Sequence, residues 1–100
     1  GGISENLSRV LPKNTGAEIL LDKLDFENKR SIFNWFHQNC KLNQKEMLKT
    51  FNCGIGFCLI IKKKNFKKIK KYFSKNFEPY IIGKIINGKN KVELNGKIEW

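Results

Sequence analysis

The stretch from Thr50 to Gly56 constrains this chain more than any other, because it leads directly into the apolar run 57–61. That run is too short for most helices and contains β-branched residues, so it predicts a strand over residues 55–62. Gly54 and Gly56 lie where the expected strand begins. Glycines at such a position exclude side chains and mark a place where another group approaches the backbone closely.

A second glycine pair opens the sequence, at Gly1 and Gly2. The apolar residues Ile3, Leu7 and Val10 recur at helical spacing and predict a short helix directly after the pair. A glycine turn followed by a helix N-terminus presents unpaired backbone N–H groups and the positive end of the helix dipole, which together suit a phosphate. A plain turn without an anion is the alternative that the sequence leaves open.

Length and composition indicate one globular domain. A chain of 100 residues with 40% hydrophobic and 12% aromatic residues can bury a modest core. The sequence begins inside a glycine loop, so we expect residues 1–100 to be a fragment of a protein that continues upstream. It contains neither an apolar run long enough to span a bilayer nor the features of a signal peptide, which predicts a cytoplasmic location and no membrane partner.

The formal net charge of +11 raises the question of a polyanionic partner. The basic excess is nearly all lysine, as on the permissive surface positions of a protein from an AT-rich genome, so no specific nucleic-acid partner is expected. The aromatic residues Phe66, Tyr72 and Phe73 recur at helical spacing and are interpreted as a core stripe. A basic module that binds RNA through these rings and the neighbouring lysines is the alternative. The lysines in question are Lys62, Lys63, Lys64, Lys67, Lys68, Lys70, Lys71 and Lys75.

The cysteines and the histidine give no sign of a metal or catalytic centre. The spacings of Cys40, Cys53 and Cys58 match neither a zinc motif nor a redox pair, so reduced structural thiols are expected. His37 stands among aromatic residues without an acidic or cysteine neighbour, so we assign it a packing or surface role. No metal ligand is therefore predicted, and the catalytic residues stay unknown.

Helical and strand patterns alternate along the chain. Apolar periodicity and turn residues predict strands over 17–21, 55–62, 79–86 and about 92–94, and helices over 3–10, 31–39, 43–50 and 65–75. Asn87 and Gly88 predict a tight turn that makes a hairpin of the last two strands, and Trp35 and Phe51 are expected in the core. We therefore expect an α+β domain, with helices packed on a mostly antiparallel sheet of about four strands.

Helix start signals support three of these helices. Ser31 is the expected N-cap of the second helix, after the polar stretch 25–29, and Asn65 is the expected N-cap of the lysine-rich helix. Asn43, with Glu46 three residues later, makes a variant of the capping box at the start of the third helix.

Four motifs that follow one another along the chain carry a resemblance to a known family. They are Gly1-Gly2-x-x-Glu5-Asn6-x-x-Arg9-Val10-Leu11-Pro12, Ile32-Phe33-x-Trp35, Glu46-Met47-x-x-Thr50-Phe51-Asn52-x-Gly54-x-Gly56 and Ile82-Gly83-x-Ile85. In this order they resemble the C-terminal domain of the phosphoribosylformylglycinamidine cyclo-ligase family, also called aminoimidazole ribonucleotide synthetase. Ser8 stands where the family usually has proline. Lys49 stands where it usually has arginine, which keeps a cation but loses the bidentate fork.

The resemblance implies an ATP-dependent carbon–nitrogen ligase of de novo purine biosynthesis. Members of the family use ATP and magnesium to phosphorylate an amide-type oxygen of formylglycinamidine ribonucleotide, after which a nitrogen closes the imidazole ring of aminoimidazole ribonucleotide. Most ATP-binding and magnesium-binding residues lie in an N-terminal domain, which is absent from residues 1–100, and the family works as a homodimer. These residues alone are therefore expected to be catalytically silent. The alternative enzyme is the sister formylglycinamidine ribonucleotide synthase, which shares the two-domain plan.

By the same resemblance, the two glycine features are expected to face each other and to bind the phosphate of the ribonucleotide substrate. The N-terminus of the first helix would hold the phosphate through backbone N–H groups, and Asn52 would line the opposite wall. Structural roles remain open, with Glu5 as a helix cap, Arg9 as the partner of a carboxylate, and Thr50 and Asn52 as residues that shape the turn. The binding residues expected are Gly1, Gly2, Asn6, Arg9, Lys49, Thr50, Asn52 and Gly54.

If the lysine excess lies on a solvated face, the domain should bind RNA only weakly and without sequence preference. Each phosphate contact releases counterions, so such binding falls steeply as salt is added. Fluorescence anisotropy with labelled RNAs of different sequence should show that binding vanishes by physiological salt. Tight, sequence-selective binding at that salt would favour the RNA-binding module instead.

Overall fold

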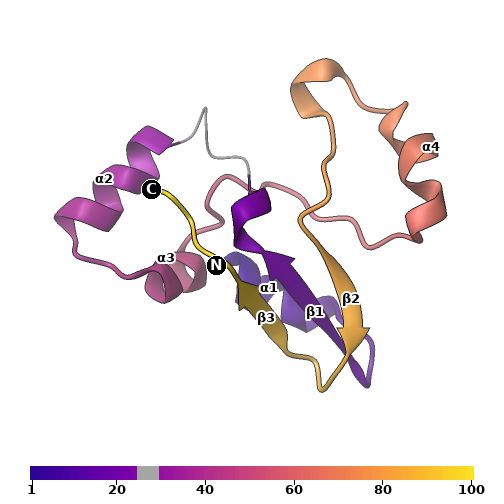
Figure 1. The fold of residues 1–100 in the computed structure, drawn as a ribbon, viewed down its shortest axis with the longest axis horizontal. Coiled ribbons are helices and arrows are strands. Elements are labelled where there is room, and N and C mark those ends of the chain that lie inside the picture. The colour runs from indigo at the N-terminus through magenta and orange to yellow at the C-terminus, as the bar shows by residue number, and fades with distance from the viewer. Residues whose placement is uncertain (25–29) are drawn as a thin grey trace.

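The structure is a computed structural model that describes residues 1–24 and 30–100, so the polar stretch 25–29 lies outside the described residues. Its helices are α1 (Ile3–Val10), α2 (Arg30–Asn39), α3 (Gln44–Thr50) and α4 (Phe66–Lys70). Short 3-10 turns are η1 (Leu21–Lys23), η2 (Lys63–Asn65) and η3 (Lys75–Phe77), and the strands are β1 (Thr15–Leu20), β2 (Gly83–Asn87) and β3 (Val92–Asn95). Figure 1 shows α1 lying against the sheet, with α2 and α3 on one side and α4 on the other. The expected α+β class is confirmed.

Strand β1 occupies the centre of a sheet with the order β2-β1-β3. β2 runs antiparallel to β1 with Ile85 opposite Ala17, whereas β3 runs parallel to β1 with Val92 opposite the same Ala17. The sheet of the described residues therefore has three strands rather than about four. One of its two pairings is parallel, so the expectation of a mostly antiparallel sheet is also wrong here.

The turn after β2 does not form the hairpin that its sequence predicts, because residues 88–91 cross the beginning of β1. The Asn90 N–H donates to the Thr15 carbonyl at 2.8 Å, which ties the crossing chain to the first residue of β1. A Cβ on Gly88 would lie 3.3 Å from the Cα of Gly16, so two glycines allow the chains to pass closely. The crossing carries the chain from one edge of β1 to the other.

The strand expected over residues 55–62 is absent from the sheet. Residues 56–61 form an elongated connection from α3 to η2 and make no backbone hydrogen bond within the described part of the chain (Figure 1). A strand exists only with a neighbour, and both edges of β1 are already occupied by β2 and β3. The apolar pattern is that of a strand, but no described strand pairs with it.

The core lies between the sheet and the helices α1 and α3. Ile3 of α1, Ile19 of β1 and Leu48 of α3 belong to one buried cluster. The opposite face of the sheet is polar, since the Glu18 carboxylate accepts from Asn95 Nδ2 at 3.0 Å and lies 3.9 Å from Lys84 Nζ. Such one-sided burial is typical of a two-layer domain. The buried hydrophobic residues described are Ile3, Leu11, Ala17, Ile19, Leu21, Leu24, Met47, Leu48, Cys53 and Ile98.

The expected helix starts are met to different degrees. The capping box of α3 is confirmed: the Glu46 N–H donates to Asn43 Oδ1 at 3.0 Å, and the Asn43 N–H donates to Glu46 Oε2 at 2.8 Å. Asn65 occupies the N-cap position of α4, but its side chain makes no capping bond. Helix α2 begins at Arg30, so Ser31 lies inside its first turn rather than at the N-cap.

Trp35 is not the core residue that its aromatic neighbours suggest. Its side chain is 56% exposed, on the outer side of α2, where it packs edge-on against Phe36. Phe51 is partly buried and packs against Phe33 and Phe36, with ring centroids 6.1 and 5.1 Å apart. The expectation of a core role is therefore wrong for Trp35, whereas Phe51 packs at the margin of the core.

The three cysteines are unpaired, and the histidine packs against an aromatic ring. All three cysteines are free, and Cys53 is buried, which raises the pKa of its thiol to about 11 and keeps it protonated at neutral pH. Cys40 and Cys58 are exposed, so the expected structural role holds for Cys53 alone. His37 stacks on Trp100 with ring centroids 5.2 Å apart, which confirms its packing role.

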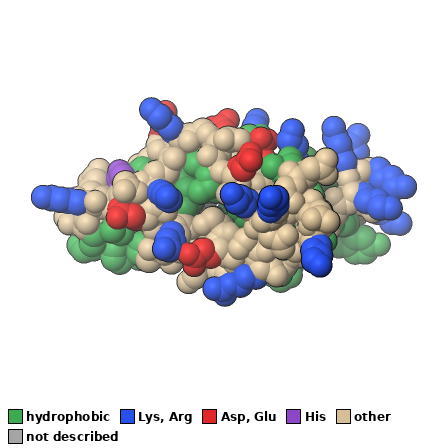
Figure 2. All heavy atoms as spheres, turned by 90° about the horizontal axis from the view of Figure 1, so that it is seen from below, with side chains coloured by type: hydrophobic (Ala, Val, Ile, Leu, Met, Phe, Trp, Pro, Cys, Tyr) green, Lys and Arg blue, Asp and Glu red, His purple; other side chains and the backbone are tan. Residues whose placement is uncertain are grey.

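Residues 62–78 form an arm around α4 at one end of the molecule. Figure 2 shows lysines gathered at this end, with hydrophobic side chains on its opposite side. Helix α4 ends at Lys70 rather than near Lys75, and Tyr72 is 82% exposed. The interpretation of Tyr72 and Phe73 as a core stripe is therefore wrong, because no described element covers the arm. Among the described residues, no helix is long and apolar enough to cross a membrane.

Leu48→Ala should lower the free energy of unfolding by about 2–5 kcal/mol, because loss of a fully buried side chain leaves a cavity in the core. Trp35→Ala is the control, since its exposed ring should cost much less despite its larger size. Urea denaturation of both variants beside the wild type measures the two changes. A larger loss for Trp35→Ala would contradict the exposed position of this ring.

Candidate functional site

The N-terminus of α1 packs directly on the C-terminus of α3. The Gly2 N–H donates to the Lys49 carbonyl at 2.9 Å, and Ser4 Oγ lies 3.5 Å from the Leu48 carbonyl oxygen. Gly2 is buried, and a Cβ at this position would lie only 2.1 Å from the same Leu48 oxygen. The close contact between the two helix ends therefore requires a residue without a side chain.

This packing occupies one of the backbone N–H donors that were expected from the sequence to bind a phosphate. The Gly2 N–H is already bonded, but the next N–H groups, those of Ile3, Ser4 and Glu5, have no acceptor within the helix. Nor do they donate to any acceptor in the described part of the chain. The Glu5 carboxylate lies 3.9 Å from Lys49 Nζ, so it pairs with a cation instead of capping the helix. The α1 N-terminus thus keeps donors for an anion beyond Gly2.

A tight turn after α3 brings the next segment alongside α1. Asn52 Oδ1 accepts the Gly54 N–H at 3.0 Å, and the Asn52 carbonyl accepts the Ile55 N–H at 3.0 Å. Cys53 and Gly54 have φ angles of 49° and 89°, the left-handed region that glycine adopts without strain. The buried Cys53 side chain anchors this turn in the core. Asn52 therefore shapes the turn, which is the structural role that the sequence left open for it.

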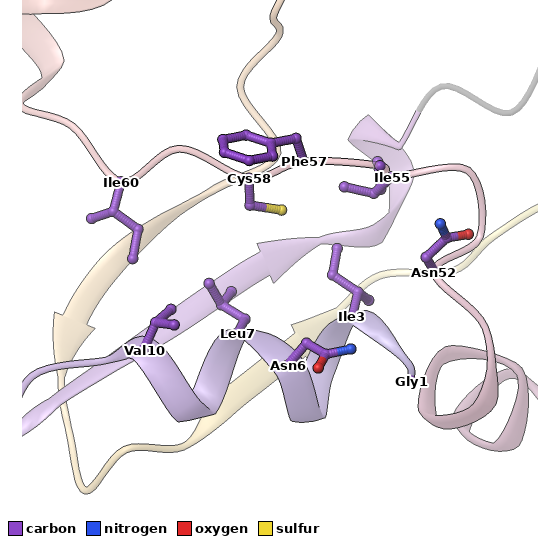
Figure 3. Close-up of a pocket in the computed structure, with 11 residues that line it drawn as sticks. Gly1, Ile3, Asn6, Leu7, Val10, Asn52, Ile55, Phe57, Cys58 and Ile60 are labelled. Carbon is purple, nitrogen blue, oxygen red and sulfur yellow. The ribbon is translucent and has the colours of Figure 1, made fainter.

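A pocket with a volume of about 380 Å³ lies between α1 and the segment that follows this turn. In Figure 3, Asn6 and Asn52 lie at the end of the pocket near Gly1, whereas Val10 and Ile60 lie at the opposite end. Small-molecule sites commonly combine a largely apolar lining with a few polar groups that fix orientation. The apolar part is lined by Ile3, Leu7, Val10, Ile55, Phe57, Cys58 and Ile60.

The fold brings three of the expected binding residues into this pocket. Gly1, Asn6 and Asn52 all line it, so the two glycine features do face each other across it. Asn6 also donates through Nδ2 to the Gly2 carbonyl at 3.1 Å, which fixes its side chain. Arg9 stands beside the pocket, with Nη1 3.5 Å from Asn6 Oδ1, and this contact rather than a carboxylate is its described partner.

The other four expected residues do not line the pocket. Gly2 is buried at the helix junction, and Gly54 belongs to the turn. Lys49 and Thr50 are exposed at the end of α3, and the Lys49 ammonium lies beside the Glu5 carboxylate. Exposed ion pairs of this kind contribute little energy, so this contact fixes Lys49 only loosely.

The apolar lining is the part of the site that the sequence did not identify. The helical spacing of Ile3, Leu7 and Val10 marks an apolar face, but only the fold shows that this face looks across a pocket at Phe57 and Ile60. Partial burial raises the pKa of the Cys58 thiol, which leaves it neutral and weakly nucleophilic at pH 7. Among the described residues, no group of three or more His, Cys, Asp or Glu side chains could hold a metal ion.

Comparison with known proteins connects this domain to purine biosynthesis. The family model of AIR synthase related protein, C-terminal domain, matches residues 1–95. A phosphoribosylformylglycinamidine cyclo-ligase of Bacillus cytotoxicus is 38% identical over 100 residues, which are 99% of this chain and 28% of that protein. A trifunctional purine biosynthetic protein adenosine-3 of Gallus gallus is 38% identical over 86 residues, which are 86% of this chain and 8% of that protein.

A bifunctional purine biosynthetic protein purD of Dictyostelium discoideum is 37% identical over 99 residues, which are 98% of this chain and 12% of that protein. The chain thus spans less than a third of the length of each of these three relatives.

Gly2→Ala should destabilise the domain by about 1–3 kcal/mol, because its methyl group would overlap the carbonyls of Leu48 and Lys49. Gly56→Ala is the matched control, since a Cβ there meets nothing within 4 Å. Thermal unfolding followed by circular dichroism compares the two. Equal melting temperatures for both variants would show that α1 and α3 do not meet as closely as described.

Proposed function

The chain belongs to the family of AIR synthase related proteins, of which it is a C-terminal domain, and from this membership we propose its role. It serves in an ATP-dependent cyclo-ligase of de novo purine biosynthesis. The reaction closes the imidazole ring of formylglycinamidine ribonucleotide and yields aminoimidazole ribonucleotide. The name of the Bacillus cytotoxicus relative, phosphoribosylformylglycinamidine cyclo-ligase, supports this enzyme over the sister synthase that the sequence left open.

The observation that carries the proposal is that the pocket beside α1 is polar at one end and apolar at the other. Asn6 and Asn52 lie at one end of it, close to the free N–H groups at the α1 N-terminus. Backbone donors at a helix N-terminus and side-chain amides both suit the phosphate of a ribonucleotide. The guanidinium of Arg9, held beside Asn6, adds a positive charge at the same end.

The apolar end of the pocket would receive the remainder of the substrate. Leu7, Val10 and Ile60 offer no hydrogen bonds there, so they would hold the base precursor by contact and limit the access of water. The residues of this chain therefore bind and orient the substrate. We place the catalytic residues in the part of the protein outside residues 1–100.

That outside part is proposed to include an N-terminal domain that binds ATP and Mg²⁺. ATP supplies the phosphoryl group that turns an amide oxygen of the substrate into a leaving group. The pocket beside α1 would be one wall of a cleft that the N-terminal domain completes, in an enzyme that works as a cytoplasmic homodimer. The three free thiols are compatible with a reducing compartment.

Asn52→Asp in the full-length enzyme should lower kcat/KM for the ribonucleotide by about 10- to 150-fold, the range for losing a hydrogen bond to a charged group. An aspartate keeps an oxygen for the Gly54 N–H, so the turn should survive, but it removes the amide donor and repels a phosphate. Asn76→Asp is the matched control, because it adds the same charge on the exposed arm.

Ring-closure kinetics and melting temperatures of the two variants are measured side by side. We expect unchanged melting temperatures for both and a loss of activity for Asn52→Asp alone. Wild-type kinetics for Asn52→Asp would show that the pocket does not bind the substrate phosphate. Equal losses in the two variants would point to a general effect of charge.

A further inference from the structure

The apolar run 57–61 lies on the surface of this domain. Phe57 is 82% exposed, and Leu59 and Ile60 are each almost half exposed. No charged residue stands between Lys49 and Lys62, and residues 57–61 carry no polar side chain other than a thiol, so nothing in the run itself favours exposure to water. A long, uncharged, exposed run is a template for pairing with another chain, and proteins cover or interrupt such runs.

The backbone of the same segment is free to pair. Between the turn that ends at Ile55 and the first residue before η2, Lys62, residues 56–61 make no backbone hydrogen bond within the described part of the chain. Six residues extend over roughly 20 Å, which is the usual length of a strand. A Cβ at Gly56 would meet nothing within 4 Å, so no described part of the chain packs against this residue.

One side of the segment already has a partner and the other does not. Gly56, Phe57, Cys58 and Ile60 line the pocket, whereas Leu59 and Ile61 are not part of the lining. From Cys58 to Ile61 the lining and non-lining residues alternate, as the side chains of a strand do, although the adjacent Phe57 also belongs to the lining. Residues 58–61 therefore have the side-chain arrangement of a strand with one face toward the pocket, without the neighbouring strand that would hold it.

We propose that residues 56–61 become a β-strand by pairing with a strand from the part of the full-length polypeptide outside residues 1–100. The inference rests on the family membership and not on the reaction proposed above. The cyclo-ligase relative matches 99% of this chain, yet the match covers only 28% of that relative, so ample polypeptide is available. A segment of the same polypeptide is present at high effective concentration and can pair without a separate association step.

The partner of residues 56–61 must also be one that binds an uncharged segment. Because the segment carries no lysine or arginine, it offers nothing to a polyanion, and the lysines of the arm begin only after it. A neighbouring apolar strand would contact the exposed side chains of this segment, and its backbone would form hydrogen bonds with the unpaired N–H and C=O groups. Such pairing would also fix Phe57, Cys58 and Ile60 in the pocket wall.

Hydrogen exchange of the full-length protein, followed by mass spectrometry, tests the pairing directly. Alternate amides of residues 57–61, those that bond to the partner strand, should exchange about 100-fold or more slowly than in an unstructured peptide, because ladder hydrogen bonds protect them. Exchange at the unstructured rate would overturn the proposal. Protection that disappears when the protein is diluted to monomers would also overturn it, since a second copy would then be the partner.

A pair of variants of the full-length protein provides an independent readout. Leu59 and Tyr72 are both exposed in this domain, but only Leu59 lies in the proposed strand. Leu59→Lys should abolish the protection, because it places a charge beside the apolar side chains of the added strand, whereas Tyr72→Lys should leave it unchanged. Equal protection in the two variants would contradict the proposal. Both measurements are made without substrate, so a failure here is distinct from a failure of the proposed reaction.

Discussion

The contact between the first residues of α1 and the last residues of α3 is the interaction on which the rest of this domain depends. The Gly2 N–H binds the Lys49 carbonyl at 2.9 Å, and the positive end of one helix dipole there meets the negative end of another. Ile3 and Leu48 then enter the same buried cluster, which holds α1 on the sheet. The turn after α3 can run beside α1 only because of this contact. The pocket therefore owes its shape to a glycine that does not line it.

Strand β1 organises the other half of the domain. Both its edges are paired, and the crossing at residues 88–91 lets two strands that are neighbours in sequence lie on opposite sides of it. One face of the sheet is polar around Glu18, so burial is confined to the side of α1 and α3. A domain of this size with one apolar layer cannot cover every apolar residue that it carries. Tyr72 is among the apolar residues left exposed.

Residues 56–61 take part in both proposed roles of the domain, because they form one wall of the pocket and an unpaired edge. A partner strand would hold Phe57 and Ile60 in place, and a bound substrate would hold them from the pocket side. Two events that order the same residues favour each other, since the second then costs less conformational entropy. Assembly of the full-length protein and substrate binding would in this way be coupled through one short segment.

The sequence by itself determined the features that depend on neighbouring residues. The helix from Ile3, the strand β1 and the capping box at Asn43 follow from local periodicity and turn chemistry, and the order of the motifs identified the family. Pairing partners and exposure depend on distant chain, so the tertiary structure decided them. The sequence around Gly88 predicts a hairpin, but in the fold β1 lies between β2 and β3, so these two strands do not pair. The exposure of Trp35 likewise depends on which distant residues pack against α2. Only the fold showed that Gly2 packs against the backbone of α3 and that Asn6 and Asn52 line the pocket. A glycine motif in the sequence indicates that something approaches the backbone, but it does not show whether this is a helix, a ligand or solvent.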